Sequence, residues 1–196
     1  MICIILSSLV IPLLLLSPSE VSAVTPVFTL VETPSVERTW EDLSILHPEQ
    51  YMNSSMVEEE IENIHSTVPE LVDVEVIGQS YEGRDIYSIR ITNEDAPYQK
   101  AKALVVAHHH GREMVTVNVA IYFMLWLLNG YGSDPQITEY VDTEEIYIIP
   151  TLNPDALNYI YNTNDPYLRK NLRPYDDDGD GLFDEDYYED VDDDGY

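Results

Sequence analysis

The feature that constrains the fold most is a long apolar segment, MVTVNVAIYFMLWLLNG, which occupies residues 114–130. It is apolar on nearly all sides and too long for a strand, and Gly130 closes it as glycine commonly closes a helix. The run KALVVAHHH at 102–110 stands before it and begins with a short, solidly apolar stretch. Such a stretch is typical of a strand that is covered on both faces of a sheet. The two segments together predict a buried strand that leads into a buried helix.

An amphipathic helix is predicted over residues 54–69, SSMVEEEIENIHSTVP. Ser55 and Glu58 have the spacing of a capping box, which marks the N-terminus of a helix. Apolar residues recur four and three positions apart, which places them on one helical face: Val57, Ile61 and Ile64. One side of this helix is therefore expected to pack on a core.

Further strands and a short helix complete the pattern. Residues 71–92 hold two apolar-alternating runs around a turn that contains Gly and Ser, and they predict a hairpin. Residues 133–141 predict a short helix with Pro135 in its first turn, and residues 144–159 predict a buried strand that runs into a polar loop. The order helix, strand, strand, strand, helix, helix, strand indicates an α/β fold in which a mixed β-sheet is flanked by helices. We assign this body to residues 39–175.

The N-terminal residues 1–23 are predicted to be a secretory signal peptide, so the protein is expected to be secreted. Its apolar core runs from Ile2 to Leu16 and is followed by small residues of the kind that signal peptidase prefers, ending at Ala23. A membrane anchor is the alternative, but the run is shorter than the ~20 residues that span a bilayer, and stable membrane insertion is not expected. Residues 24–38, rich in Pro, Thr and Val, are expected to form a linker.

The composition excludes two classes of partner. The chain has 9 Lys and Arg residues against 37 Asp and Glu residues, and its net charge is -28. Nucleic acid and anionic membrane surfaces are therefore not expected to bind it. The single cysteine, Cys3, lies within the predicted signal peptide, which leaves the rest of the chain without a thiol for a disulfide or for a metal thiolate.

The polar turn HHHGRE at 108–113 is the first candidate for a functional site. It ends one predicted strand and opens a helix, and functional residues of open α/β sheets collect in loops past the carboxyl ends of strands. Histidine nitrogens and a carboxylate oxygen suit Zn2+, and a set of two His and one Glu leaves a fourth position for water. Glu113 lies three residues after His110 and four after His109, and either spacing can aim both groups at one point. A plain polar turn with Glu113 near the helix N-terminus is the alternative, and residue types alone do not choose among the three histidines.

Four segments in order carry a family resemblance: IGQSYEGRDIYSIRIT, VVAHHHGREMVT, YIIPTLNPDALNY and YLRKNLRP. Over residues 71–173 the chain resembles the N-terminal part of a zinc carboxypeptidase of the carboxypeptidase A/B type. The metal motif of that family, His-x-Arg-Glu, falls on His110, Arg112 and Glu113. The resemblance implies that His110 and Glu113 are zinc ligands and that Arg112 helps to bind the peptide substrate. His108 and His109 then support the ligands or lie at the surface.

The family's Trp-Arg-Lys segment matches Leu168-Arg169-Lys170, and the resemblance assigns Arg169 to the scissile carbonyl and its oxyanion. Positive charge beside a zinc site suits a peptide or protein substrate with a free C-terminus, whereas ordinary surface salt bridges are the alternative for these bases. The chain departs from the family pattern at three positions: Met114, Ala156 and Leu168. Met114 and Leu168 leave the shape of the pocket open, and Ala156, which stands where glycine is usual, affects a local turn.

The Asp-rich end at 176–196 is predicted to be a calcium-binding insertion. Alternate carboxylates at Asp176, Asp178 and Asp180 stand before a glycine. The same pattern recurs at residues 190–195. EF-hand loops use this arrangement to wrap Ca2+ with about six to eight oxygens. Tyr187 stands at the twelfth position, where an EF-hand has Glu, so Asp184 and Asp186 are the further candidate ligands. A solvated acidic tail is the alternative.

The resemblance also implies residues that the sequence does not contain. The family uses a downstream histidine as its third zinc ligand, and no histidine follows His110 here. It also uses an Asn-Arg pair for the terminal carboxylate of the substrate, a tyrosine and a glutamate general base. We therefore expect the chain to be the front part of a longer enzyme, to bind zinc weakly and to be inactive on peptides by itself. The alternative is a secreted calcium-binding or scaffold protein with a non-catalytic carboxypeptidase-like region.

Overall fold

The computed structural model describes residues 38–176 and 178–184. The predicted signal peptide at 1–23, the predicted linker up to residue 37 and the second Asp repeat at 190–195 lie outside the described residues. The helices and strands, in chain order, are α1 (Ser54–Thr67), β1 (Val72–Gln79), β2 (Asp85–Ile91), β3 (Ala101–Val106), α2 (Val115–Gly130), α3 (Pro135–Thr143), β4 (Glu144–Ile149) and α4 (Pro154–Thr163).

The strands of the described region form one mixed sheet in the order β1-β2-β4-β3. β1 and β2 are the predicted hairpin and pair antiparallel, with Val72 opposite Ile91 and Gln79 opposite Asp85. β2 also pairs antiparallel with β4, whereas β3 and β4 are parallel. Because β3 and β4 run in the same direction, their carboxyl ends meet at one edge of the sheet. The predicted α/β fold with a mixed sheet flanked by helices is confirmed.

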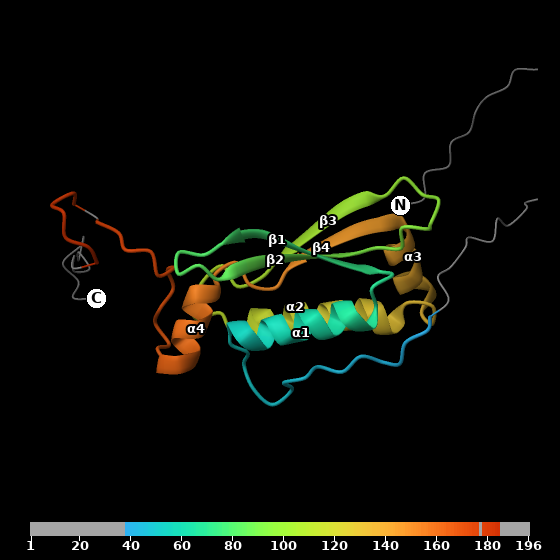
Figure 1. Cartoon of the computed structure of the whole chain (residues 1–196), viewed down its shortest axis with the longest axis horizontal. Coiled ribbons are helices and arrows are strands. Elements are labelled where there is room, and N and C mark those ends of the chain that lie inside the picture. The colour runs from blue at the N-terminus through green and yellow to red at the C-terminus, as the bar shows by residue number, and fades with distance from the viewer. Residues whose placement is uncertain (1–37, 177, 185–196) are drawn as a thin grey trace, which may run out of the picture. The chain divides into compact units, whose positions relative to one another are not determined.

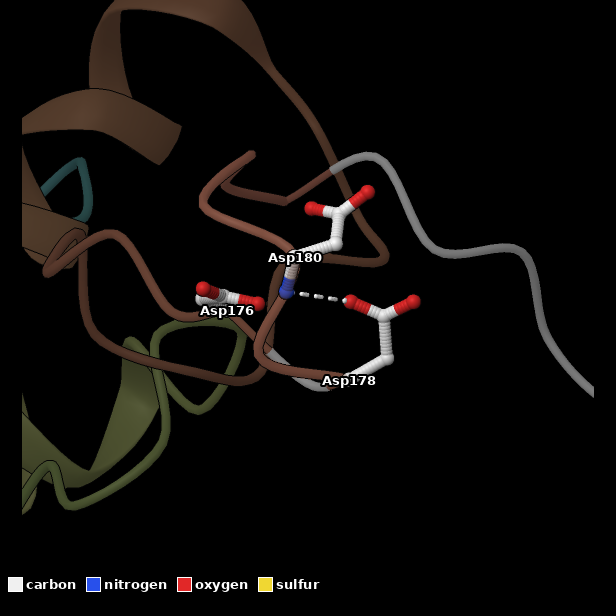
Figure 2. Close-up of side chains that lie close together, drawn as sticks. All are labelled: Asp176, Asp178 and Asp180. Carbon is white, nitrogen blue, oxygen red and sulfur yellow. Dashed lines mark hydrogen bonds between the residues drawn. The ribbon is translucent and has the colours of Figure 1, made fainter.

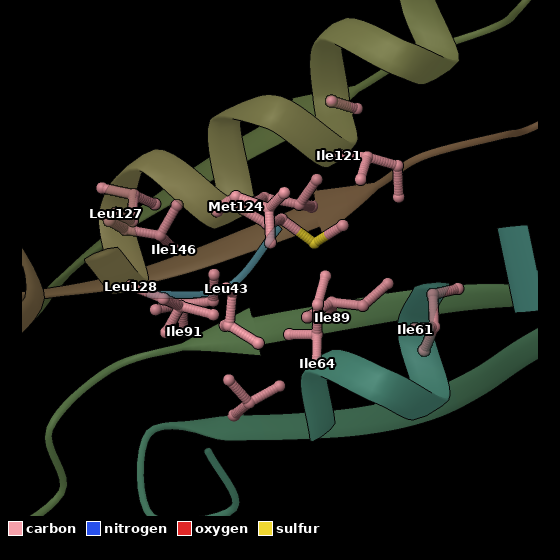
Figure 3. Close-up of a cluster of buried hydrophobic side chains, with 14 of the residues drawn as sticks. Leu43, Ile61, Ile64, Ile89, Ile91, Ile121, Met124, Leu127, Leu128 and Ile146 are labelled. Carbon is pink, nitrogen blue, oxygen red and sulfur yellow. The ribbon is translucent and has the colours of Figure 1, made fainter. Parts of the chain in front are cut away.

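The hydrophobic core lies between the sheet and the two long helices, α1 and α2, which pack against each other beneath it (Figure 1). Side chains of both helices meet those of the central strands β2 and β4 (Figure 3). The labelled contributors are Leu43, which precedes α1, Ile61 and Ile64 of α1, Ile89 and Ile91 of β2, Ile121, Met124, Leu127 and Leu128 of α2, and Ile146 of β4. Burying large aliphatic side chains stabilises the fold by roughly 1.5–3 kcal/mol each, so this layer holds the sheet in place.

The edge position of β3 corrects the prediction of a strand covered on both faces. Residues from Ala101 to Val105 are exposed, with 65% of Leu104 and 36% of Val105 accessible, so both faces of this strand are open, and no described strand pairs beyond it. α2 is likewise buried along one side and exposed along another, at Val115, Val119, Tyr122 and Trp126. Among the described residues no single helix is long and apolar enough to cross a membrane. Helices α2 and α3 taken together have the length and the apolar composition for it, but they are bent by 105° relative to each other.

Two local predictions need correction at helix starts. α1 is capped by Asn53 rather than by Ser55: the Asn53 side chain accepts a hydrogen bond from the backbone N–H of Met56 at 2.9 Å. The Ser55 hydroxyl instead donates to the side-chain Oδ1 of Asn53 at 2.9 Å. The segment predicted as a polar loop after β4 contains α4, whose first residue is proline and whose cap is an asparagine, and both are favourable at a helix N-terminus.

Candidate metal site

The turn that joins β3 to α2 lies at the carboxyl edge of the sheet. Beyond β3, the backbone N–H of Ala107 donates to Ile149 at 2.9 Å, and the N–H of Leu152 donates to Ala107 at 3.2 Å. These bonds continue the parallel pairing of β3 and β4 past the strand ends. The two loops that follow the strands are therefore held side by side, as expected for a functional site in an α/β sheet.

His110 and Glu113 face each other within this turn. His110 Nδ1 lies 3.0 Å from Glu113 Oε1, and the two side chains are 36% and 44% exposed. Two ligands at about 2.0–2.1 Å from a tetrahedral zinc ion lie about 3.3 Å apart, so small side-chain rotations would open this pair to the ion. The chemistry and separation of the donor atoms therefore fit two positions of a zinc site. In the described part of the chain, no group of three close metal-binding side chains includes this pair.

The neighbouring histidines differ sharply in their surroundings. His108 is buried, and its ring bonds with Thr151 Oγ1 at 3.0 Å and with the Gly111 carbonyl oxygen at 2.9 Å. Burial lowers the pKa of His108 below its ordinary value, which favours the neutral ring. His109 is exposed, and its backbone carbonyl accepts a bond from the Asn153 side chain at 3.3 Å.

The segment that carries Arg169 is hydrogen-bonded through its backbone to the metal turn, residues 108–113, and to the loop after β4. The N–H of Gly111 donates to the Arg169 carbonyl at 3.1 Å, and the Asn153 side chain donates to the Lys170 carbonyl at 3.4 Å. His110 and Arg169 consequently line one cavity of about 760 Å3, which Arg173 also lines. No carboxylate in the described region forms an ion pair with Arg169 or Arg173, whereas Lys170 forms an exposed ion pair with Asp184, as the alternative of surface salt bridges expects.

Arg112 and Glu113 lie outside that cavity. Arg112 lines a separate cavity of about 550 Å3 with Tyr51 and Met114, and Glu113 lines a third one of about 400 Å3 together with His109. The turn therefore directs successive side chains into different spaces. The structure brings His110 to Glu113 and to the Arg169 cavity, but it does not bring Arg112 there, and the role of Arg112 in substrate binding stays a prediction.

Asp155 fixes another wall of the His110 cavity, and sequence reasoning did not single it out. Its buried carboxylate accepts from Ser80 Oγ at 2.6 Å, from the Glu82 N–H at 2.9 Å and from Arg84 Nη1 at 2.7 Å. Burial alone would raise the pKa of Asp155, but these donors outweigh it and hold the pKa below its usual value. The hairpin turn that supplies Ser80 and Tyr81 to the cavity wall is thereby attached to the start of α4. Both partner segments were visible in the sequence, but nothing local indicates that they meet.

The described part of the Asp-rich end brings three of its predicted calcium ligands together. Carboxylate oxygens of Asp176, Asp178 and Asp180 lie within 4.8 Å of one another, and Asp178 accepts from the Asp180 N–H at 3.0 Å (Figure 2). Asp184 is not in this group, because it forms an ion pair with Lys170. The lysine and the backbone N–H of Tyr175 keep the pKa of the Asp184 carboxyl below its usual value. Asp186, the other candidate, lies outside the described residues.

Comparison with known proteins gives one family. The sequence pattern described as "Zinc carboxypeptidase" matches residues 57–192. A protein named zinc carboxypeptidase from Saccharothrix mutabilis subsp. capreolus is 31% identical over 132 residues, which are 65% of this chain and 30% of that protein. The inactive metallocarboxypeptidase ECM14 of Saccharomyces cerevisiae is 31% identical over 110 residues, or 55% of this chain and 25% of that protein. The chain thus spans about a third or less of the length of these relatives.

Solved structures show the same fold. Thrombin activatable fibrinolysis inhibitor matches with a TM-score of 0.61 and 24% identity, over 67% of this chain and 32% of that one. The carboxypeptidase A from Helicoverpa armigera matches with a TM-score of 0.56 and 23% identity, over 69% of this chain and 32% of that one. At these identities the likeness establishes the arrangement of helices and strands.

Proposed function

The chain belongs to the zinc carboxypeptidase family, and from this premise we propose that it is part of a secreted zinc metallocarboxypeptidase that hydrolyses the peptide bond next to a free C-terminus. The observation that carries the proposal is the pair of His110 Nδ1 and Glu113 Oε1, 3.0 Å apart at the carboxyl edge of the sheet. The proposed localisation rests on the predicted signal peptide at 1–23. Peptide or protein substrates with a free C-terminus are the partners that this function implies.

Each residue has a separate part in the proposed reaction. His110 and Glu113 would hold the zinc ion, which, when bound, supplies Lewis acidity toward a carbonyl and a water of lowered pKa. Arg169 reaches the His110 cavity without an ionic partner among the described residues, so its guanidinium is available for the scissile carbonyl and for the oxyanion that develops there. The hydrogen bond from the Gly111 N–H to the Arg169 backbone carbonyl attaches the segment that carries this side chain to the metal turn.

Activity of the chain by itself is not part of the proposal. The relatives include proteins named zinc carboxypeptidase and proteins named inactive metallocarboxypeptidase, so family membership alone does not establish catalysis. The described residues supply two zinc ligands to the turn and offer no third one close to them. We propose that the 196-residue chain binds zinc weakly and does not release C-terminal residues from peptides.

The test of the metal pair, His110 and Glu113, is zinc titration of the purified chain, followed by NMR at the backbone amide of Gly111. His110→Ala and Glu113→Gln should each abolish the specific response, whereas His65→Ala, a change at an exposed histidine on α1, should leave the Glu113 and Gly111 signals responsive. Zinc binding that survives both changes at the turn would show that the pair is not the site. Release of C-terminal amino acids by the unmodified chain would overturn the proposed inactivity.

The second candidate function, a secreted calcium-binding or scaffold protein, is favoured by the three convergent carboxylates of the Asp-rich loop. Under this alternative the loop takes up Ca2+ and the metal turn has no catalytic use. Calcium titration should then give a response that Asp178→Asn and Asp180→Asn remove and that Asp95→Asn, at an exposed acid elsewhere, retains. Sequencing the gene past the Tyr196 codon separates the two functions: a frame that continues into a histidine, an Asn-Arg pair and a glutamate supports the enzyme.

A further inference from the structure

His108 is the buried histidine of the turn, and the metal pair does not explain it. It is 1% exposed, although the next two histidines along the chain are exposed or half-exposed. Both of its ring nitrogens have partners, Thr151 Oγ1 at 3.0 Å and the Gly111 carbonyl oxygen at 2.9 Å. Thr151 follows β4, so the ring joins the end of one strand to the loop that follows its neighbour.

The partners of the ring define its tautomer. A carbonyl oxygen can only accept a hydrogen bond, so Nε2 must carry the proton that is shared with Gly111. In the neutral ring Nδ1 is then an acceptor, and the Thr151 hydroxyl donates to it. This assignment leaves no polar atom of the buried ring without a partner.

The bonds of His108 reach the backbone of the metal turn at two points. The ring binds the carbonyl of Gly111, the residue directly after His110. The backbone N–H of His108 donates to Thr116 Oγ1 at 3.0 Å, and the same hydroxyl donates to the Glu113 carbonyl at 2.7 Å. His108 therefore holds the backbone at Gly111, next to His110, and through Thr116 it also holds the backbone of Glu113.

The backbone of His108 is strained, which indicates that the side chain is needed. Its φ is 52°, in the left-handed region that glycine adopts without cost and that other residues seldom adopt. Strain of this kind persists where surrounding interactions impose it, and it is found preferentially near functional sites. The imidazole bonds are the interactions that glycine could not make.

We propose that His108 is the positioning residue of the metal pair: through the Gly111 carbonyl and Thr116 it sets the separation and direction of His110 Nδ1 and Glu113 Oε1. The proposal rests on the zinc site of the proposed function. Residues that orient metal ligands from outside the ligand set commonly change metal affinity by about 10–100-fold when they are replaced.

The test compares three variants of the full chain by zinc titration, followed at the backbone amide resonance of Gly111 so that ions bound by the Asp-rich loop do not contribute. His108→Gly relieves the backbone strain and removes the ring, and it should weaken zinc binding by about tenfold or more. His108→Gln keeps a side-chain N–H near the Nε2 position, and it should recover most of the affinity. His109→Gln, at the exposed neighbour, is the matched control and should bind as the unmodified chain does.

Two outcomes separate this proposal from the zinc site itself. If His110→Ala abolishes zinc binding while His108→Gly binds zinc as the unmodified chain does, the site stands and the positioning role is overturned. If His110→Ala also binds normally, the proposed function fails first. Long-range 1H–15N spectra of the unmodified chain give an independent reading, because a proton on Nδ1 of His108 rather than on Nε2 would contradict the bond to Gly111.

Discussion

Gly111 and Ala156 form a contact that predicts a measurable energetic coupling between the metal turn and α4. A Cβ atom at Gly111 would lie 2.9 Å from Ala156 Cβ, 3.0 Å from the Leu168 carbonyl oxygen and 3.1 Å from Ile160 Cδ1. The first two of these atoms belong to a fully buried helix position and to the backbone, and neither can move by a change of rotamer. Close packing against Ala156 therefore leaves room only for glycine at position 111. Ala156 itself stands at a position where the family usually has glycine.

The expected cost of Gly111→Ala follows from two opposed terms. Overpacking of a close contact costs about 1–3 kcal/mol. Alanine also restricts the unfolded chain, which returns about 0.4–1 kcal/mol, because the backbone at 111 is not left-handed. The net loss of unfolding free energy is expected to be about 1–2 kcal/mol. Ala156→Gly alone should cost about 1 kcal/mol as a glycine within a helix.

The double variant distinguishes packing from other causes. Because Ala156→Gly removes the nearest obstructing atom, the combined change should be less destabilising than the sum of the single changes by about 1 kcal/mol, within the range of coupling between contacting residues. Urea unfolding followed by far-UV circular dichroism measures all four proteins. Gly78→Ala is the matched control, since an added Cβ there meets nothing within 4 Å. Additive single effects, or a Gly111→Ala protein as stable as the unmodified one, would refute the reasoning.

Three further predictions concern stability. Burial raises the pKa of Glu60, whose Oε2 has no hydrogen-bond partner, so the folded state holds a proton that the unfolded state has released, and stability should fall as the pH rises from about 4.3 through the folded pKa. In urea titrations between pH 4 and pH 8, the Glu60→Gln protein should therefore gain stability relative to the unmodified chain. A stability difference that stays constant with pH would contradict this. Asp155 has a lowered pKa because of its hydrogen-bond donors, Arg84 among them, so its contribution to stability is present above about pH 3.9 and is lost on acidification through the folded pKa. Asp155→Asn should lower the free energy of unfolding by about 2–3 kcal/mol at pH 7 and by little at the acid end. Chemical unfolding at several pH values would check this. Ile121→Ala, at a fully buried position of α2, should cost about 2–5 kcal/mol, whereas Val119→Ala, at a 61% exposed position, should stay within about 0.5 kcal/mol; equal losses in thermal or urea unfolding would mean that the buried side of α2 is assigned wrongly.

The sequence by itself determined the elements whose signals are local. The apolar length of residues 114–130 predicted α2 up to Gly130, and alternation around a turn predicted the β1–β2 hairpin. The residue types of HHHGRE indicated a metal site but left three histidines open, and only the family resemblance selected His110 with Glu113. These signals are contained in short windows of the chain, since periodicity and capping depend on neighbours within a few residues.

The tertiary structure decided what depends on residues far apart in the sequence. It placed β3 at the edge of the sheet, so that an apolar strand is exposed, and it buried His108 between the loops that follow two different strands. It also joined Asp155 to a hairpin turn more than seventy residues away and paired Asp184 with Lys170 rather than with the other acidic side chains. Exposure and hydrogen-bond partners of this kind are set by how strands and helices pack in three dimensions. No pattern within a single segment contains that information.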